Sequence, residues 1–314
     1  MLAILGCIGL LSCLGARTAE ASTFGISLSS GSGSNYAYPG CGVTTSYSSD
    51  SGGSATTSTG AVGCSISYGV PVPTGLTSGS VYANSQSPDG SGGTRSAAGS
   101  AAVSLATGSL HAFASATDNN GSCCAQGSAG ATLWDTLTFN IAGASASTVT
   151  NIPIFFEVDG TASDPANESW SAFLQFSGCG FFNACGIDPG GTVVWSQGYD
   201  GQGLTAVSGN LANEDGLASI AWMTPTVSNA NDLDIEGILS LTGPSVTLEI
   251  SADLEVLASD GVVDYGDTAG ISFQLPQGVT FTSASGDFLT PEPASLALLS
   301  AGLLGVGWTR RRRT

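Results

Sequence analysis

Apolar and polar residues alternate strictly along residues 246–258, the clearest structural pattern in the chain. The apolar positions are Val246, Leu248, Ile250, Ala252, Leu254, Val256 and Ala258. The positions between them are mostly Ser, Thr and acidic residues. A period of two sustained over this length predicts a β-strand with one buried face and one solvated face.

Shorter alternations of the same kind fill most of the chain after residue 100. Residues 101–106 and 110–116 flank Thr107-Gly108-Ser109, which predicts a hairpin. Further strands are expected at 133–141, 152–158, 170–176, 217–223, 233–241, 271–275 and 279–281. No strand–helix–strand rhythm appears, so the pattern predicts an all-β chain folded as an antiparallel β-sandwich.

Three local expectations follow from turn chemistry and from the alternation of apolar and polar positions. Asp159-Gly160 is a turn pair and is expected to end the strand before it. Trp170 is in phase with Leu174 and Phe176, which predicts a core position. Trp222 is out of phase with its apolar neighbours and is expected to be exposed.

Composition separates the first part of the chain from the rest. The 314 residues include 45 Gly and no Lys, and only 10% are charged. Residues 22–100 are rich in Ser, Gly and Thr, with short strand-like runs at 24–28 and 42–47. This part is expected to be less regular β structure with long loops. Residues 22–289 are interpreted as the all-β domain.

The N-terminus has the form of a secretory signal. An apolar run at residues 2–14 precedes Ala19-Glu20-Ala21, an A-x-A cleavage pattern. We interpret residues 1–21 as a signal peptide cut after Ala21. Leu10-Leu11-Ser12-Cys13 leaves lipid attachment at Cys13 as an alternative.

The C-terminal residues 290–314 carry three features in a fixed order. They are Pro291-Glu292-Pro293, the uncharged run Leu296 to Trp308, and an arginine block of Arg310, Arg311, Arg312 and Arg313. As a helix the apolar run spans roughly 20 Å, which makes a short transmembrane segment. The helix is expected to start near Ala294, because Pro293 cannot continue it upstream. The arginines should stay on the cytoplasmic side.

This tail resembles the PEP-CTERM sorting signal of Gram-negative bacteria that make extracellular polysaccharide. The resemblance implies processing by exosortase, a membrane protease-transpeptidase. It also implies export through the inner membrane to the cell envelope, cell surface or extracellular matrix. The sorting residues would be Pro291, Glu292, Pro293 and Arg310 to Arg313. An ordinary C-terminal tail anchor is the alternative.

Removing both end segments leaves Arg95 against 23 acidic residues, a net charge of about −22. Such a chain has no basic patch to neutralise phosphates, which excludes nucleic acid as a partner. Cys7 and Cys13 would leave with the signal. The six remaining cysteines are disulfide candidates in an exported protein: Cys41, Cys64, Cys123, Cys124, Cys179 and Cys185. Proximity favours Cys179 with Cys185 and, second, Cys41 with Cys64.

Candidate catalytic residues are sparse. His111 is the single histidine and lies on a strand-like segment, where a surface position is expected rather than a general base. Glu157 with Asp159, and Glu249 with Asp253, are carboxylate pairs that a glycosidase could use. Both pairs fall on the polar side of expected strands.

Asp232-x-Asp234-x-Glu236 imitates the start of a calcium loop, but the twelfth position is Gly243 rather than Glu. A strand with acidic outer residues is the preferred interpretation. No cofactor is therefore expected, with calcium as a weak possibility, and the metal ligands are unknown.

These observations predict an exported, non-enzymatic envelope or matrix protein, and the resemblance of its tail implies association with exopolysaccharide. The alternatives are a carbohydrate-binding module with stacking aromatics or, third, a polysaccharide-acting glycosidase.

Overall fold

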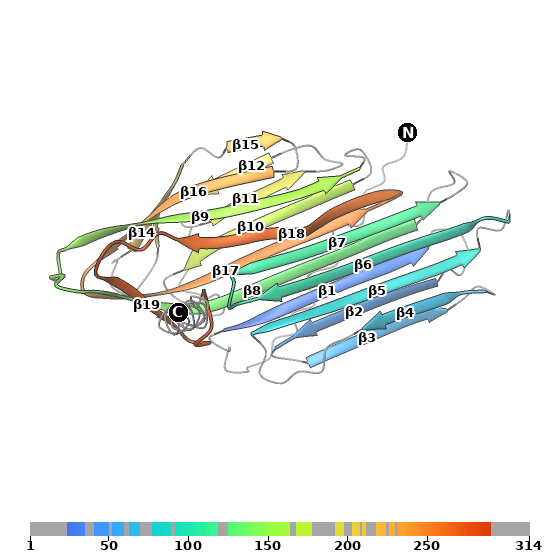
Figure 1. Ribbon diagram of the computed structural model, residues 1–314, viewed down its shortest axis with the longest axis horizontal. Coiled ribbons are helices and arrows are strands. Elements are labelled where there is room, and N and C mark those ends of the chain that lie inside the picture. Colours follow the sequence, from blue (N-terminus) through green and yellow to red (C-terminus); the bar gives the residue numbers. More distant parts are fainter. Residues whose placement is uncertain are drawn as a thin grey trace, which may run out of the picture.

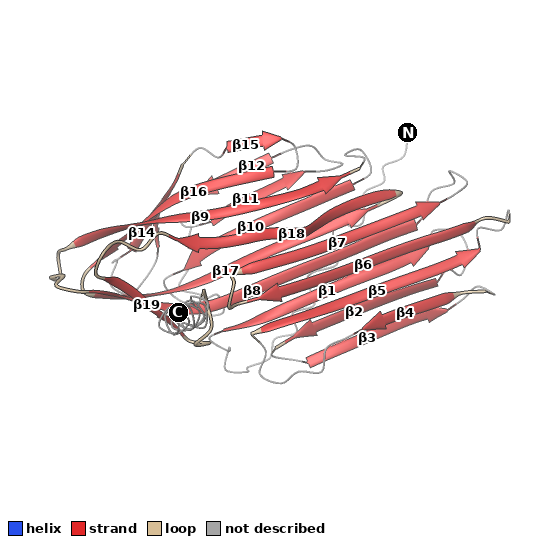
Figure 2. Cartoon of the chain, in the orientation of Figure 1, coloured by secondary structure: helices blue, strands red, loops and turns tan. Residues whose placement is uncertain are grey.

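Strands account for nearly all of the described chain, as Figure 2 shows. The structure is a computed structural model. It describes residues 24–34, 41–49, 52–59, 63–69, 77–88, 92–118, 125–163, 168–177, 192–197, 203–207, 209–211, 218–223, 226–229 and 232–289. The predicted signal peptide, the predicted sorting helix and the four cysteines from Cys123 to Cys185 lie outside these ranges. Within them no helix is long and apolar enough to cross a membrane.

The described strands form two antiparallel sheets (Figure 1). Sheet A contains β1 (Phe24–Ser34), β2 (Cys41–Ser48), β3 (Gly52–Thr59), β8 (Ala125–Ile141), β10 (Glu168–Ser177), β11 (Thr192–Gln197), β12 (Gly203–Val207), β17 (Ser245–Ala258) and β19 (Val279–Ser283). Its order is β12-β11-β10-β17-β8-β1-β2-β3, and β19 pairs with β8.

Sheet B contains β4 (Ser65–Gly69), β5 (Ser78–Pro88), β6 (Thr94–Ser104), β7 (Ser109–Asp118), β9 (Val149–Ala162), β13 (Gly209–Leu211), β14 (Ala218–Trp222), β15 (Thr226–Asn229), β16 (Asp232–Thr242) and β18 (Gly261–Phe273). Its order is β13-β14-β16-β9-β18-β7-β6-β5-β4, and β15 pairs with β16. The predicted all-β fold of antiparallel sheets is confirmed.

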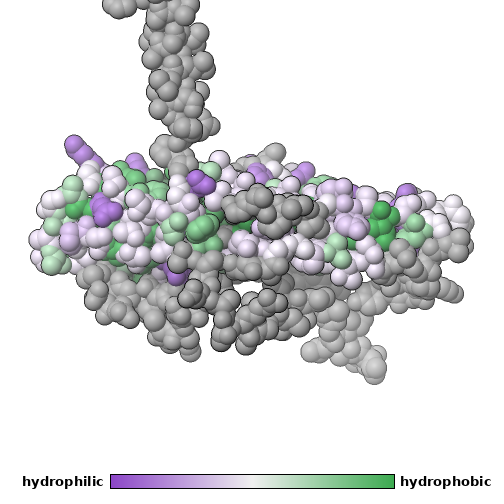
Figure 3. All heavy atoms as spheres, turned by 90° about the horizontal axis from the view of Figure 1, so that it is seen from below, coloured by the Kyte–Doolittle hydropathy of each residue, from purple (hydrophilic) through white to green (hydrophobic). Residues whose placement is uncertain are grey.

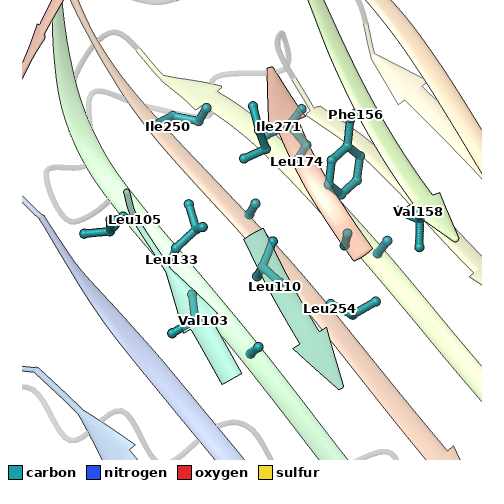
Figure 4. Packing of buried hydrophobic residues seen from close by; sticks show 14 of the residues in the cluster. Val103, Leu105, Leu110, Leu133, Phe156, Val158, Leu174, Ile250, Leu254 and Ile271 are labelled. Carbon is teal, nitrogen blue, oxygen red and sulfur yellow. The ribbon is translucent and has the colours of Figure 1, made fainter. Parts of the chain in front are cut away.

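One buried apolar cluster lies between the sheets and draws on both of them. Figure 4 shows Leu133, Leu174, Ile250 and Leu254 of sheet A close to Leu110, Phe156 and Ile271 of sheet B. The seven apolar residues predicted for the inner face of β17 are all buried, at 3% exposure or less. Alternation therefore identified the core side of this central strand correctly.

The predicted hairpin at residues 107–109 is present as the turn between β6 and β7. The described parts of residues 22–100 are more regular than expected, because they form the long strands β1, β2, β3 and β5. The small polar residues of these strands alternate with buried apolar ones such as Leu28, Val43 and Val81. A period of two therefore operates even in a Ser/Gly-rich sequence.

Two predictions about individual positions are wrong. Asp159-Gly160 does not end a strand, because β9 continues to Ala162. A Cβ at Gly160 would overlap the ring of Tyr265, so this glycine makes room for an aromatic from β18. Tyr265 in turn stacks on Trp170 of sheet A, with ring centroids 4.7 Å apart.

Trp222 is not an exposed aromatic. It lies over Gly237 of the neighbouring strand, where a Cβ would come within 2.6 Å of the indole. Its ring also contacts Phe176 of sheet A, at a centroid distance of 6.3 Å. Trp170, by contrast, is 2% exposed, so its predicted core position is confirmed.

A disulfide joins Cys41 to Cys64, with Cα atoms 5.7 Å apart. Cys41 begins β2 in sheet A, and Cys64 precedes β4 in sheet B, so the bond links the two sheets. The pairing proposed second from sequence is therefore confirmed. The pairing proposed first, Cys179 with Cys185, lies outside the described residues.

Candidate functional site

The described residues end at Leu289, two positions before Pro291, the first predicted sorting residue. Pro291, Glu292, Pro293 and the arginines Arg310, Arg311, Arg312 and Arg313 lie outside the described residues. The candidate site that the structure defines is therefore the segment that leads into the tail. This segment, residues 279–289, is called the tail root below.

The tail root begins with β19, which runs along one side of β8. Strand β1 occupies that side of β8 from residue 125 to 135, and β19 takes residues 137–141. β19 thus continues the line of β1 in sheet A (Figure 1). Val279 is 7% exposed and Phe281 packs against the core, so the alternation in the sequence places these side chains inward.

A buried carboxylate holds the next residues. Asp135 of β8 is 1% exposed, and its Oδ1 accepts hydrogen bonds from the backbone N–H groups of Thr136 (2.8 Å) and Ser285 (3.2 Å). Its Oδ2 accepts a hydrogen bond from the hydroxyl of Ser285. Burial raises the pKa of Asp135, and the hydrogen bonds from Ser285 and Thr136 oppose this rise.

The last two described residues are also fixed. The Phe288 side chain is 1% exposed, and its backbone N–H donates to the hydroxyl oxygens of Ser283 and Ser285 at 3.2 Å each. The N–H of Leu289 donates to the carbonyl oxygen of Leu105, 3.0 Å away. The sandwich therefore holds the chain as far as Leu289, the residue directly before the tail of residues 290–314.

The conformation of Leu289 depends on the turn between β6 and β7. Leu289 has φ of 46°, a left-handed value that costs about 1 kcal/mol or more for a residue with a Cβ. Gly108 in the turn has φ of 63°, and a Cβ there would lie 2.6 Å from Cδ2 of Leu289. The glycine thus serves both the turn and the packing of the tail root.

An apolar pocket of about 710 Å³ opens beside the tail root. Its lining includes Phe273, Leu275, Phe281, Phe288 and Leu289. The rings of Phe273 and Phe281 have centroids 5.8 Å apart, and Phe288 lies 6.3 Å from Phe273. Leu275 is 37% exposed, so apolar surface at this end of the sandwich faces solvent.

His111 lies on the outer face of β7, as expected for a surface strand histidine. Its Nδ1 is 2.6 Å from the carbonyl oxygen of Gly266. Because a carbonyl can only accept, Nδ1 carries the proton of this bond. The histidine thereby fixes an irregular stretch of β18, where the register shifts between Tyr265 and Ala269.

Each of the two predicted carboxylate pairs lies on a single strand, and the two strands belong to different sheets. Glu157 and Asp159 are exposed on β9 of sheet B, whereas Glu249 and Asp253 are on β17 of sheet A. Burial, followed by the charge of Glu255, raises the pKa of Asp253 to about 7, and a hydrogen bond from Thr132 opposes the rise. Burial also raises the pKa of Glu255.

The acidic motif at 232–236 belongs to strand β16, with Leu233 and Ile235 buried and Asp234 exposed. The preferred interpretation, a strand with acidic outer residues, is confirmed. Across the described ranges, no group of three or more His, Cys, Asp or Glu side chains is placed to hold a metal ion.

Sequence reasoning missed Asp135, Ser285 and Gly108 as parts of the tail root. One signal was available for Asp135, because it interrupts the apolar series Leu133, Trp134 and Leu137 with a charge. Ser285, the partner that makes Asp135 part of the tail root, is 150 residues away, so no local pattern could identify it.

Comparisons with known proteins bear on the tail. No curated protein and no solved structure matches the chain. Residues 289–313 match the family model of the PEP-CTERM protein-sorting motif. The match begins at Leu289, the residue held by the carbonyl of Leu105. The motif implies processing by exosortase and export across the inner membrane to the envelope of a Gram-negative bacterium. The C-terminus of this chain, from Leu289 on, is a PEP-CTERM protein-sorting motif.

Proposed function

We propose that this chain is a non-enzymatic structural protein of the cell envelope or extracellular matrix, delivered there by its sorting tail. The observation that carries the proposal is the direct connection between the sandwich and the sorting motif. Phe288 is buried and Leu289 is hydrogen-bonded, so one residue of the sequence, Thr290, lies between the last described residue of the folded body and Pro291-Glu292-Pro293. Exosortase would therefore act on a body displayed close to the membrane.

The composition of the body supports a structural role. Most of its described residues are in long antiparallel strands around one core. A disulfide joins the two sheets, as suits a protein that works in an oxidising compartment. The excess of acidic residues keeps such a body soluble after release and attracts cations to it. Exopolysaccharide is the proposed surrounding, and this part of the proposal rests on the sorting motif alone.

The sorting step is testable through Pro291-Glu292-Pro293. Glu292→Ala, or the double change Pro291→Ala with Pro293→Ala, should leave membrane insertion intact because the apolar run and the arginines are unchanged. Processing should stop, and a larger membrane-bound form should accumulate in the native host. Immunoblots for size, on separated membrane and soluble fractions, measure both effects.

The matched control alters the other end of the tail. Replacing Arg310 to Arg313 with Ser should weaken retention of the tail in the membrane, since the positive charges that orient it are gone. If the Glu292→Ala protein is trimmed at the wild-type rate, the tail is an ordinary anchor and exosortase sorting is refuted.

Carbohydrate binding is a second candidate, favoured by one row of residues on the outer face of sheet B. Tyr82, Ser100 and Phe113 are neighbours across β5, β6 and β7. Tyr82 is 44% exposed and its ring lies over Gly69 of β4. Aromatic rings separated by a small residue offer stacking surfaces for sugars.

A glycan-array screen of the exported protein tests this candidate. Binding that disappears in Tyr82→Ala and in Phe113→Ala would support it, and Tyr68→Ala is the control because Tyr68 is equally exposed (46%) but lies outside the row. An array without binding would refute this candidate, and the structural role would be the proposal that remains.

A further inference from the structure

We propose that the apolar pocket beside the tail root is a docking site for exosortase, in which an extended segment of the enzyme inserts an apolar side chain. Phe273, Leu275, Phe281, Phe288 and Leu289 contribute to the lining of this pocket, which is called the tail-root pocket below. Docking there rests on the proposed function, because exosortase must process the tail. It assigns part of the recognition to the folded body rather than to the sorting motif.

The fixed position of Leu289 keeps the sorting residues close to the tail-root pocket. The N–H of Leu289 donates to the carbonyl oxygen of Leu105 at 3.0 Å, and Leu289 itself lines the pocket. Pro291 and Pro293 follow Leu289 closely in the sequence. Even at full extension they lie at most about 7 Å and about 14 Å from it. An enzyme that holds Pro291-Glu292-Pro293 therefore works directly beside the pocket.

The size of an enzyme brings its surface onto the sandwich at this point. Even a small folded domain is about 30 Å across, about twice the greatest distance from Leu289 to Pro293. The surface of exosortase around its active site must therefore lie over the surface of the sandwich around Leu289. The family match of the sorting motif also begins at Leu289. The tail-root pocket and the motif that the enzyme processes thus form one continuous surface.

The tail-root pocket lies beside an open strand edge of sheet B. β7 pairs with β18 only as far as Gly270, and the N–H of Ile271 donates to the carbonyl oxygen of Gly108 at 3.1 Å. Beyond Ile271, no strand of the described ranges pairs with this side of β18. Phe273 is two residues further on, so its backbone N–H and C=O point to the same open side. An extended peptide can add to this edge through main-chain hydrogen bonds.

Apolar side chains supply the other half of the docking site. Leu275 is 37% exposed at the rim of the tail-root pocket, and the rings of Phe273 and Phe281 lie 5.8 Å apart in its wall. Figure 3 shows the narrow side of the sandwich, with hydrophobic residues reaching the surface among weakly polar ones. Domains that bind extended peptides combine a free strand edge, which gives affinity, with pockets that select side chains. The tail-root pocket offers both features.

Other occupants fit this site less well. The chain that follows Leu289 contains Pro291 and Pro293, which have no N–H to donate to the edge of β18. A second copy of the body carries the same net charge of about −22, which repels it. The enzyme, in contrast, is brought to this surface by the sorting motif itself.

Photo-crosslinking of the full chain in its native host tests the docking directly. The change Leu275→p-benzoylphenylalanine places a crosslinker at the rim of the tail-root pocket. It should form a cross-link to exosortase, identified by mass spectrometry and missing from a host that lacks the enzyme. The control is Val262→p-benzoylphenylalanine, because Val262 is 40% exposed but lies at the other end of β18. This position should not cross-link to exosortase.

A matched pair of uncharged substitutions measures how much the docking contributes. Pulse-chase labelling should show a half-time of trimming at least about fivefold longer in Leu275→Gln, as expected for the loss of one apolar side-chain contact. Val262→Gln should be trimmed at the wild-type rate. Limited proteolysis near Leu289 should be unchanged in both variants, which shows that the tail root stays in place.

The possible failures are distinguishable. If Glu292→Ala is trimmed at the wild-type rate, exosortase sorting is refuted and the docking with it. If Glu292→Ala stops trimming but Leu275→Gln does not slow it, the docking alone is refuted. A cross-link from position 275 to residues 290–314 or to a second copy would overturn the enzyme as occupant. Slower trimming of Leu275→Gln without a cross-link to exosortase would overturn it as well.

Discussion

The disulfide between Cys41 and Cys64 offers a quantitative test of what stabilises the sandwich. The cross-linked cysteines are 23 residues apart, and closing a loop of this length restricts the unfolded chain. The chain-entropy relation gives a stabilisation of about 3.4 kcal/mol at 25 °C. The core offers little compensation in this region, because the buried residues of β5 and β6 are mostly Ala and Ser with Val81 and Val103. We therefore expect the double variant Cys41→Ala with Cys64→Ala to lose most of this amount.

Urea unfolding of the exported protein, followed by tryptophan fluorescence, measures the loss. With an m-value of about 3 kcal/mol/M, the urea midpoint of the double variant should lie about 1 M below that of the wild type. The control is the same pair of proteins in excess reductant, where neither has the cross-link and the gap between the midpoints should close. Equal midpoints under oxidising conditions would refute the assigned role of the bond.

Two further predictions concern buried carboxylates. Because burial raises the pKa of Asp253 from an ordinary value near 3.8 to about 7, the folded state binds a proton that the unfolded state has lost between these values. The free energy of unfolding should therefore fall as pH rises from 4 to 7 and then level off. Urea midpoints measured across this pH range should fall less in Asp253→Asn than in the wild type. Identical pH profiles for the two proteins would contradict the burial of this group. At the tail root, Ser285→Ala removes a hydroxyl that Asp135 and the N–H of Phe288 both use, and should cost about 2 kcal/mol. Limited proteolysis should then cut more rapidly near Leu289, whereas Ser147→Ala in an exposed turn should leave the cleavage rate unchanged.

The sequence alone determined the strands and the direction of their buried faces. Alternation is a local property, since successive side chains of a strand point to opposite sides, so Val246 to Ala258 revealed one core face without knowledge of any partner. The sorting tail was equally legible, because Pro-Glu-Pro, an apolar run and an arginine block act through their own order along the chain. Six cysteines can pair in fifteen ways. The pairing placed second, Cys41 with Cys64, is present, and the one placed first, Cys179 with Cys185, lies outside the described residues.

Only the tertiary structure decided which residues meet across strands. Trp222 turned inward because Gly237 on the next strand leaves space for its ring, and Asp159-Gly160 stayed within a strand because Tyr265 fills the place of the missing side chain. Asp135 became part of the tail root through Ser285, 150 residues away. In each case the deciding neighbour lies on another strand, which no local pattern of the sequence reveals.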